Sequence, residues 1–323
     1  MDVINYNYNV SKINLNKYDL ICGFGNVFQK YFDSPHEKCI ATICYGTGMH
    51  LFFQNQATLN RVKDVFIKKN VWLGDSSRYV KNIKLHQTTL VNGIIAIGND
   101  YCAESYREHF LGYVYSVPGV FFLTQNAIKI MNNRNVSSSN NFLWFGSKGL
   151  IHKGLDLLLD HFKANSNITL HICGDIMREE NFVKIYREEL FNTPNIICHG
   201  FIDIESERFE RILELCSFVI FPSCSEGGCP SVLTAIGNGG LIPIISKETT
   251  ISTGYEILIS TLDNIGIARA IEDSQSLSWS QIIKLQKLNY QVVVENNNQN
   301  KYYSALKEAI TNILDTTQNS YLR

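Results

Sequence analysis

The stretch FVIFPSCSEGGCPSVLTAIGNGGLIPIIS, residues 218–246, decides the fold of this chain. It opens with four apolar residues followed by Pro222, a pattern typical of a buried parallel strand. A loop with one charged residue, Glu226, and a pair of glycines leads to Pro230, which suits the first turn of a helix. A Gly-Gly pair ends that helix, and residues 241–245 form a second apolar run. The stretch therefore predicts a strand, a loop, a helix and a second buried strand.

The loop of this unit is a candidate ligand site. Open α/β sheets bind ligands beyond the carboxyl ends of their strands, where the loop lies. The start of the helix offers free N–H groups to an anion, and Gly227 and Gly228 allow a ligand to approach the backbone. The alternative is an ordinary βαβ unit in which Glu226 is a solvated loop residue.

The same loop and helix resemble the donor-binding signature of retaining GT-B glycosyltransferases of family 4, also called group 1. That signature has a Glu, a Gly-rich turn and a second Glu eight positions after the first. Glu226 matches the first Glu, which in the family contacts the donor sugar. Thr234 stands in place of the second Glu, which in the family holds the ribose, and it can form only an uncharged hydrogen bond. The resemblance implies transfer of a sugar, and Thr234 in place of the second Glu implies weaker binding of the nucleotide.

From residue 141 onward, apolar strands alternate with helical patterns, and most strands end in a glycine. This repeat predicts a Rossmann-like domain whose ligand edge is lined by glycines. The expected strands are residues 142–145, 168–173, 195–198, 218–221 and 241–245. The expected helices follow Gly154 and cover residues 179–191, 279–295 and 301–314. A further helix is expected from the helical spacing of Phe209, Ile212, Leu213 and Cys216.

Residues 146–154, GSKGLIHKG, resemble the phosphate-contacting segment of the same family. By this resemblance Lys153, at the start of a helix, would meet the donor diphosphate and stabilise the charge that develops as it departs. Gly146 and Ser147 would lie beside it. Lys148 stands close to a position where the family often has Arg, and the alternative for it is a solvated surface lysine.

Further candidates follow other strand ends. The resemblance places Gly200 and Phe201 beside the nucleobase of the donor, and the alternative for Phe201 is a core position. Gly174, at the end of another strand, is also a candidate for donor binding. Gly227, Gly228 and Thr234 complete the donor side. In the first half, Thr47 and Gly48 are the candidates on the acceptor side. His50 follows them and by resemblance could contact the acceptor or the donor sugar. The alternative for His50 is a structural role. The catalytic candidates are Glu226, Lys153 and His50.

The first half is also of α/β type, with expected strands at residues 2–6, 19–25, 39–45, 93–98, 112–117 and 120–123. It begins at what would be the second strand in the family, so either the first βα unit is missing or another element replaces it, and we expect an abbreviated first domain. The polar segment 128–141 is the expected linker. The resemblance thus implies a GT-B fold, two Rossmann-like domains facing across a cleft. The expected divisions are an acceptor domain at 1–135, a donor domain at 136–300, and a helix at 301–323 that returns to the first domain.

Composition limits the classes of function. The chain has 323 residues, a net charge of −1, 45% hydrophobic residues and nine cysteines scattered through apolar runs. The charge gives no reason to expect nucleic acid as a partner, and the cysteines suit reduced thiols in a cytoplasmic protein. There is no metal-binding spacing and no Asp-x-Asp motif, so we expect neither a metal nor another cofactor.

The expected function is retaining transfer of a sugar from a UDP- or GDP-type nucleotide sugar to a glycan or lipid-linked acceptor, in cell-surface polysaccharide biosynthesis. This leaves room for a peripheral contact with the inner face of the membrane. One alternative is a catalytically inactive GT-B partner of another transferase. Another is a dinucleotide-binding enzyme, but no G-x-G-x-x-G motif follows a strand.

Overall fold

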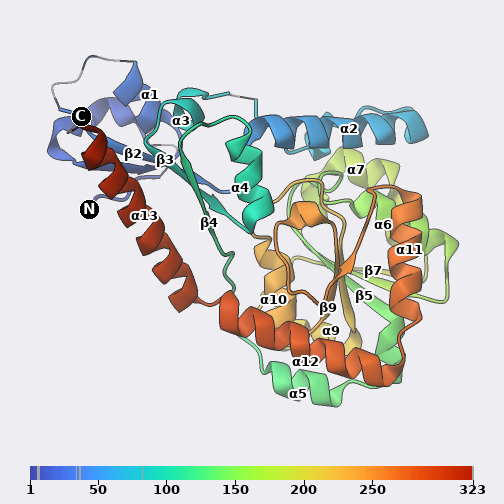
Figure 1. The fold of residues 1–323 in the computed structure, drawn as a ribbon. Coiled ribbons are helices and arrows are strands. Elements are labelled where there is room, and N and C mark those ends of the chain that lie inside the picture. The colour runs from blue at the N-terminus through green and yellow to red at the C-terminus, as the bar shows by residue number, and fades with distance from the viewer. Residues whose placement is uncertain (6–7, 34, 36–37, 82, 322–323) are drawn as a thin grey trace.

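Two Rossmann-like domains, each built on a parallel sheet, make up the computed structural model (Figure 1). The structure describes residues 1–5, 8–33, 35, 38–81 and 83–321. The prediction of an α/β protein with two such domains is confirmed. No described helix has the length and apolar character needed to cross a membrane, and none of the nine cysteines is in a disulfide.

The first sheet has four parallel strands in the order β1-β2-β3-β4. They are β1 (Leu20–Gly23), β2 (Ala41–Gly46), β3 (Gly93–Ile97) and β4 (Tyr113–Val117). The connections contain α1 (Asn26–Phe32), α2 (Leu51–Lys69), the short α3 (His86–Thr89) and α4 (Asp100–Arg107). Each crossover advances by one strand in the same direction, and crossovers are right-handed, so the connecting helices lie on one face.

The opposite face of the first sheet is covered by the end of the chain. The helix α13 (Gln299–Tyr321) packs against β2, β3 and β4, and Figure 1 shows it beside these strands. Ile313 of α13 is fully buried among Ile43, Ile95 and Val117 of the sheet. A parallel sheet needs cover on both faces, and α13 supplies the cover that the connections cannot.

The second sheet has six parallel strands in the order β10-β9-β8-β5-β6-β7. They are β5 (Asn141–Phe145), β6 (Thr169–Cys173), β7 (Ile196–Gly200), β8 (Phe218–Phe221), β9 (Ile242–Ile245) and β10 (Ile257–Leu258). The chain builds outward from β5 to β7, then returns and builds outward from β8 to β10. The order reverses between β5 and β8, and their carboxyl ends form the switch point at which ligands bind in such sheets.

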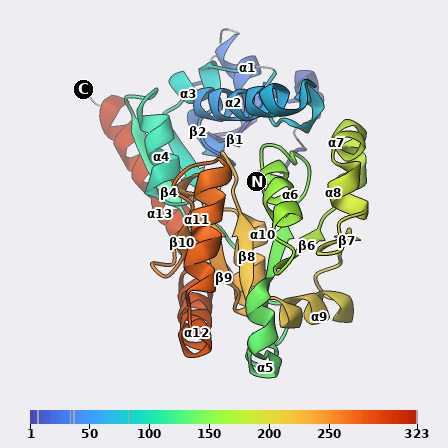
Figure 2. The same cartoon turned by 90° about the vertical axis from the view of Figure 1, so that its right-hand side faces the viewer.

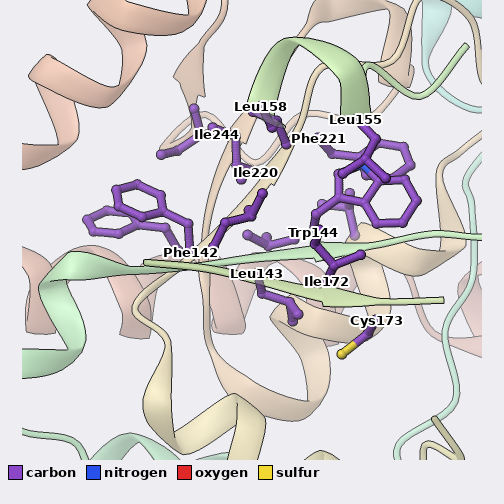
Figure 3. Packing of buried hydrophobic residues seen from close by; sticks show 14 of the residues in the cluster. Phe142, Leu143, Trp144, Leu155, Leu158, Ile172, Cys173, Ile220, Phe221 and Ile244 are labelled. Atoms are coloured by element: carbon purple, nitrogen blue, oxygen red, sulfur yellow. The ribbon is translucent and has the colours of Figure 1, made fainter. Parts of the chain in front are cut away.

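Helices cover both faces of the second sheet (Figure 2). They are α6 (Leu155–Ala164), α7 (Glu180–Ile185), α8 (Arg187–Phe191), α9 (Glu207–Leu215), α10 (Pro230–Gly239), α11 (Asn264–Gln275) and α12 (Trp279–Asn296). The ring of Trp144 in β5 stacks on the ring of Phe221 in β8, with ring centroids 6.0 Å apart. Leu155 of α6 lies beside the two rings (Figure 3). The core therefore fixes the start of α6 against the switch point.

Several local predictions were wrong. The described part of the expected first strand, residues 2–5, is not a strand, and its last residue, Tyr6, lies outside the described residues. Residues 120–123 form no regular element either. The expected helix over residues 179–191 is divided into α7 and α8, and β10 and α11 were not predicted.

The polar segment 128–141 is structured, contrary to the prediction of a linker. It contains most of α5 (Ala127–Asn133) and a 3-10 helix, Val136–Asn140. Asn126 caps α5 by accepting a hydrogen bond from the Lys129 backbone N–H at 3.0 Å, and the helix packs against α9 and α10. A few buried side chains, such as Ile130, hold the helix in spite of its polar composition.

Candidate functional site

A cleft with a cavity of about 790 Å³ lies between the two domains. The carboxyl ends of β5, β6, β7 and β8 line its second-domain side with Gly146, Ser147, Gly174, Phe201 and Glu226, among others. Tyr45, Thr47 and Gly119 line its first-domain side, together with Tyr302 of α13. The cleft thus lies at the switch point of the second sheet, where a ligand is expected.

Lys153 and Glu226 form an ion pair inside this cleft. Lys153 ends the loop that follows β5, and its backbone N–H donates to the carbonyl of Gly149 at 2.9 Å. Glu226 lies in the loop after β8, and its Oε1 also accepts a hydrogen bond from Ser223 Oγ at 3.1 Å. Their side chains are only 6% and 9% exposed. Two candidates that are 73 residues apart in the sequence therefore share one pocket.

The charges around Glu226 keep it ionised. Burial alone raises the pKa of this carboxyl, but the cations Lys153 and Arg78 outweigh burial, and the pKa lies below its ordinary value. At neutral pH the side chain is a carboxylate that only accepts hydrogen bonds. It can hold the hydroxyl groups of a ligand, but it has no proton to donate to one.

His152 joins the two loops that carry the ion pair. Burial lowers its pKa to about 4, so the ring is neutral at pH 7. Its Nε2–H donates to the carbonyl of Ser225, and its own backbone carbonyl accepts from the Cys224 N–H at 2.9 Å. This histidine therefore holds the loop around Glu226 in place.

The two glycines after Glu226 have different environments. A Cβ atom at Gly227 would lie 2.5 Å from the carbonyl oxygen of Thr47, so the loop packs tightly against the first domain. The N–H of Gly228 donates to Thr250 Oγ1 at 2.8 Å. That group is therefore engaged inside the protein, although the sequence suggested it for a ligand.

A second, smaller cavity of about 260 Å³ opens on the first-domain side. It is lined by Thr47 and Gly48 after β2, by side chains of α2 and α4, and by the loop that carries Glu226. Thr47, Arg78 and Glu226 line both cavities. Glu226 therefore stands where the two cavities meet, so ligands in both could approach the same carboxylate.

The structure does not bring His50 to the cleft. Its ring is buried beside Tyr106 and His109, and its Nδ1 accepts from the Phe52 N–H at 3.4 Å, which caps α2. Burial, with a smaller effect of His109, lowers the pKa of His50 to about 4. His50 lines neither cavity, and its environment fits the structural alternative.

Other candidates are placed in different ways. Phe201 is 76% exposed at the rim of the cleft, beside Gly200, the last residue of β7. Lys148 is exposed and faces a separate groove. Thr234 Oγ1 donates to the carbonyl of Pro230 within α10 at 2.8 Å, so this hydroxyl serves the helix.

Two features of the cleft were not predicted from the sequence. Arg78 of the first domain approaches Glu226, with Nη1 3.5 Å from Oε2. Tyr45 and Tyr302 join their hydroxyl groups at the first-domain wall. No motif of the sequence contains Arg78, Tyr45 or Tyr302, and none of the three follows a glycine turn. Among the described residues, no cluster of three or more His, Cys, Asp or Glu could hold a metal ion.

Residues 127–253 match the family model described as glycosyl transferases group 1. The match covers β5 to β9 and both loops that carry the ion pair. No curated protein matches the chain in sequence.

Solved structures resemble most of the chain, including both domains. Sucrose-phosphate synthase from Thermosynechococcus elongatus has a TM-score of 0.64 at 13% identity, over 95% of this chain and 76% of that one. Anabaena HepE, solved with UDP and glucose, has a TM-score of 0.57 at 11% identity, over 91% and 78%. The pneumococcal O-GlcNAc transferase GtfA, solved with UDP and GlcNAc, has a TM-score of 0.55 at 16% identity, over 89% and 54%.

At these identities the likeness shows the fold. The chain therefore has the GT-B fold of glycosyltransferases, and residues 127–253 of it match the group 1 glycosyl transferase family.

Proposed function

We propose that this protein is a retaining glycosyltransferase that uses a nucleotide sugar of the UDP or GDP type. The observation that carries the proposal is the buried ion pair of Lys153 and Glu226 at the switch point of the second sheet, inside an interdomain cleft. The group 1 family match over both loops supports it. The UDP in the HepE and GtfA structures supports the class of donor.

The proposed donor site is the larger cavity. The nucleotide lies along Gly174, Gly200 and Phe201, and the diphosphate lies by Gly146, Ser147 and Lys153. The transferred sugar lies against Glu226, whose carboxylate accepts hydrogen bonds from its hydroxyl groups. No metal or other cofactor takes part in the proposed reaction.

The proposed acceptor site is the smaller cavity beside Thr47 and Gly48. The acceptor hydroxyl forms a new bond to the anomeric carbon on the face from which the diphosphate departs, and its proton passes to the departing phosphate oxygen. Lys153 stabilises the charge that develops on that phosphate. Contact between the domains excludes water, which favours transfer over hydrolysis. The acceptor class we propose is a glycan or a lipid-linked glycan of a cell-surface polysaccharide.

A panel of UDP- and GDP-sugars, read by thermal shift, tests the proposal. We expect at least one of them to raise the melting temperature of the wild type. We also expect Glu226→Ala and Lys153→Ala to reduce that rise, while the exposed Lys184→Ala, which lies outside the cleft, leaves it unchanged. If a nucleotide sugar raised the melting temperature equally in all variants, the donor site would lie outside the pocket of Lys153 and Glu226.

An inactive GT-B partner is the second candidate, and the engaged hydroxyl of Thr234 favours it because no carboxylate takes the place of the second Glu of the family. Donor binding without release of nucleoside diphosphate in the presence of acceptor extracts would support this candidate. Release of the diphosphate, with the product sugar in the donor's anomeric configuration by NMR, would support the retaining transferase.

A further inference from the structure

Lys153 alone supplies too little positive charge to balance a nucleoside diphosphate in the donor cavity. The departing nucleoside diphosphate carries more than one negative charge, and the positive charge of Lys153 is already paired with Glu226. His152 is neutral at pH 7 because its pKa is about 4. Among the described residues that line the cavity, the remaining cations are Arg178, which is mostly exposed and paired with Asp175, and Arg78.

Arg78 has the geometry for a second cation. It lines the donor cavity, the smaller cavity and the groove beside them. Its Nη1 lies 3.5 Å from Glu226 Oε2, which is longer than the 2.7–2.9 Å or so of a strong charged hydrogen bond. The guanidinium has five N–H donors, its side chain is 44% exposed, and Glu226 engages it only at this distance.

The loop that carries Arg78 is fixed to α2 of the first domain. The N–H of Arg78 donates to Thr58 Oγ1 at 3.4 Å, and its carbonyl accepts from the side chain of Gln54. Asn55 binds both the N–H and the carbonyl of Val80, at 2.6 and 3.1 Å. Three polar side chains of one helix therefore set the position of this loop.

The stem of Arg78 lies against the second domain. A Cβ atom at Gly149 would lie 2.5 Å from Cγ and Cδ of Arg78, so a larger residue would collide with this side chain. Gly149 also has a φ of +94°, a backbone conformation that favours glycine. The helix α2 is itself held on α6 by the buried ion pair of Arg61 and Asp156, at 2.6 Å. The guanidinium therefore reaches the donor cavity because the two domains are in contact.

We infer that Arg78 is a further catalytic residue, which binds the terminal phosphate of the departing nucleoside diphosphate together with Lys153. This inference rests on the proposed function. It means that the first domain supplies a charge to the donor site, so that full stabilisation of the leaving group requires domain contact.

Isothermal titration calorimetry on the full chain tests the inference. UDP, GDP, ADP, CDP and dTDP are titrated into the wild type, and the tightest binder is compared with its monophosphate. We expect Arg78→Ala to weaken diphosphate binding at least tenfold and monophosphate binding less than threefold. Arg78→Lys should retain part of the affinity because it keeps the charge, and the exposed Arg211→Ala should match the wild type.

A second comparison separates a direct contact from an effect through Glu226. In a Glu226→Gln background, the loss caused by Arg78→Ala should persist if the guanidinium touches the phosphate. Loss of the effect in that background would mean that Arg78 only positions Glu226, and it would overturn the inference.

The outcomes also separate the inference from the proposed function. If Lys153→Ala weakens diphosphate binding and Arg78→Ala does not, the inference fails and the proposed function stands. If the wild type binds none of the five diphosphates, both fail.

Discussion

At the scale of single residues, Lys153 and Glu226 are two charges removed from water at neighbouring strand ends. Burying a charge is costly unless it is paired and hydrogen-bonded. Glu226 has Lys153 and Ser223 as partners, and Lys153 also lies 5.1 Å from the centre of the Phe221 ring. These contacts keep Glu226 ionised in the free protein and hold Lys153 beside it, where the two side chains can meet the phosphate and hydroxyl groups of a ligand.

The stability of the protein should depend on the ionisation of Glu226. Its pKa is lower in the folded protein than the ordinary value. The carboxylate therefore stabilises the fold above pH of about 4.3, and this contribution is lost as the pH falls through the folded pKa.

We expect Glu226→Gln to lower the free energy of unfolding at pH 7 by about 3 kcal/mol, since it leaves Lys153 buried without its charged partner. The difference from the wild type should shrink as the pH falls toward 3.5. Urea denaturation at several pH values measures this, and a difference that stays constant over that range would contradict the role given to the charge.

Thr234 gives a contrasting prediction. Because its hydroxyl bonds within α10 and lines neither cavity, we expect Thr234→Val to change the affinity for a nucleoside diphosphate by less than twofold. A larger loss, measured by calorimetry, would show that the hydroxyl turns to the ligand.

The sequence could indicate Lys153 and Glu226 because each lies in a short glycine-containing segment after an apolar strand, and because both segments resemble motifs of one glycosyltransferase family. Arg78 could not be found in this way. It lies in an irregular loop of the other domain, and only tertiary packing brings it to Glu226. The pattern around His50 is equally local, and a histidine after a glycine turn can cap a helix as well as face a cleft.

At the scale of elements, α2 connects the domains across the cleft. Arg61 of α2 pairs with Asp156 of α6, and both are buried. Further along α2, Nζ of Lys68 lies 3.6 Å from Oδ2 of Asp160. Nζ of Lys69, the next residue, lies 3.4 Å from Oε1 of Glu189. The pair of Arg61 and Asp156 is the most deeply buried of the three, so removing one of its partners should be the most costly.

Single substitutions in the buried pair should be costly. We expect Arg61→Met or Asp156→Leu alone to lower the free energy of unfolding by about 3–5 kcal/mol, because each removes one partner of the buried pair. In Asp156→Leu, Arg61 keeps only the half-exposed Asp64 as an ion-pair partner among the described residues. The double variant should recover much of this loss, and the exposed Lys63→Ala on the same helix should change little. Denaturant unfolding of all four proteins measures these effects, and additive losses in the double variant would contradict the pairing.

Elements with strong apolar patterns were predicted well, and those held by a few contacts were not. The strands β5 to β9 of the second sheet are short apolar runs and were found from the sequence, whereas the two-residue β10 was not. The helix α5 has a polar sequence and depends on Ile130 and the Asn126 cap. The break between α7 and α8 at Tyr186 has no Gly or Pro to mark it.

At the scale of the whole molecule, the last helix completes the first domain. The right-handed crossovers of a sheet built in one direction leave one face bare, and α13 covers that face with side chains such as Ala309 and Ile313. Tyr302 of the same helix lines the donor cavity. The end of the chain thus stabilises the first sheet and forms part of the site.

Truncating the apolar face of α13 tests this role. Ile313 is fully buried, and a Cβ atom at Gly93 would lie 2.6 Å from its side chain. We expect Ile313→Ala to cost about 2–5 kcal/mol and to increase hydrogen exchange in β2, β3 and β4. The exposed Lys307→Ala on the same helix should change stability by less than about 0.5 kcal/mol. Equal exchange in the two variants would contradict the role of α13.

The architecture as a whole could be predicted because alternating strands and helices permit few arrangements. The contact between the domains could not, because it depends on close approach of backbone at glycines such as Gly227 and Gly149. Such contacts leave no periodic pattern in the sequence.

The most direct test is the rate of nucleoside diphosphate release from the nucleotide sugar that stabilises the wild type. We expect Lys153→Ala to lower kcat about a hundredfold, because it removes the fixed charge at the leaving group, while Lys184→Ala keeps the wild-type rate. A Lys153→Ala enzyme that turns over within twofold of the wild type would contradict the proposal that the cleft at β5 and β8 is the active site.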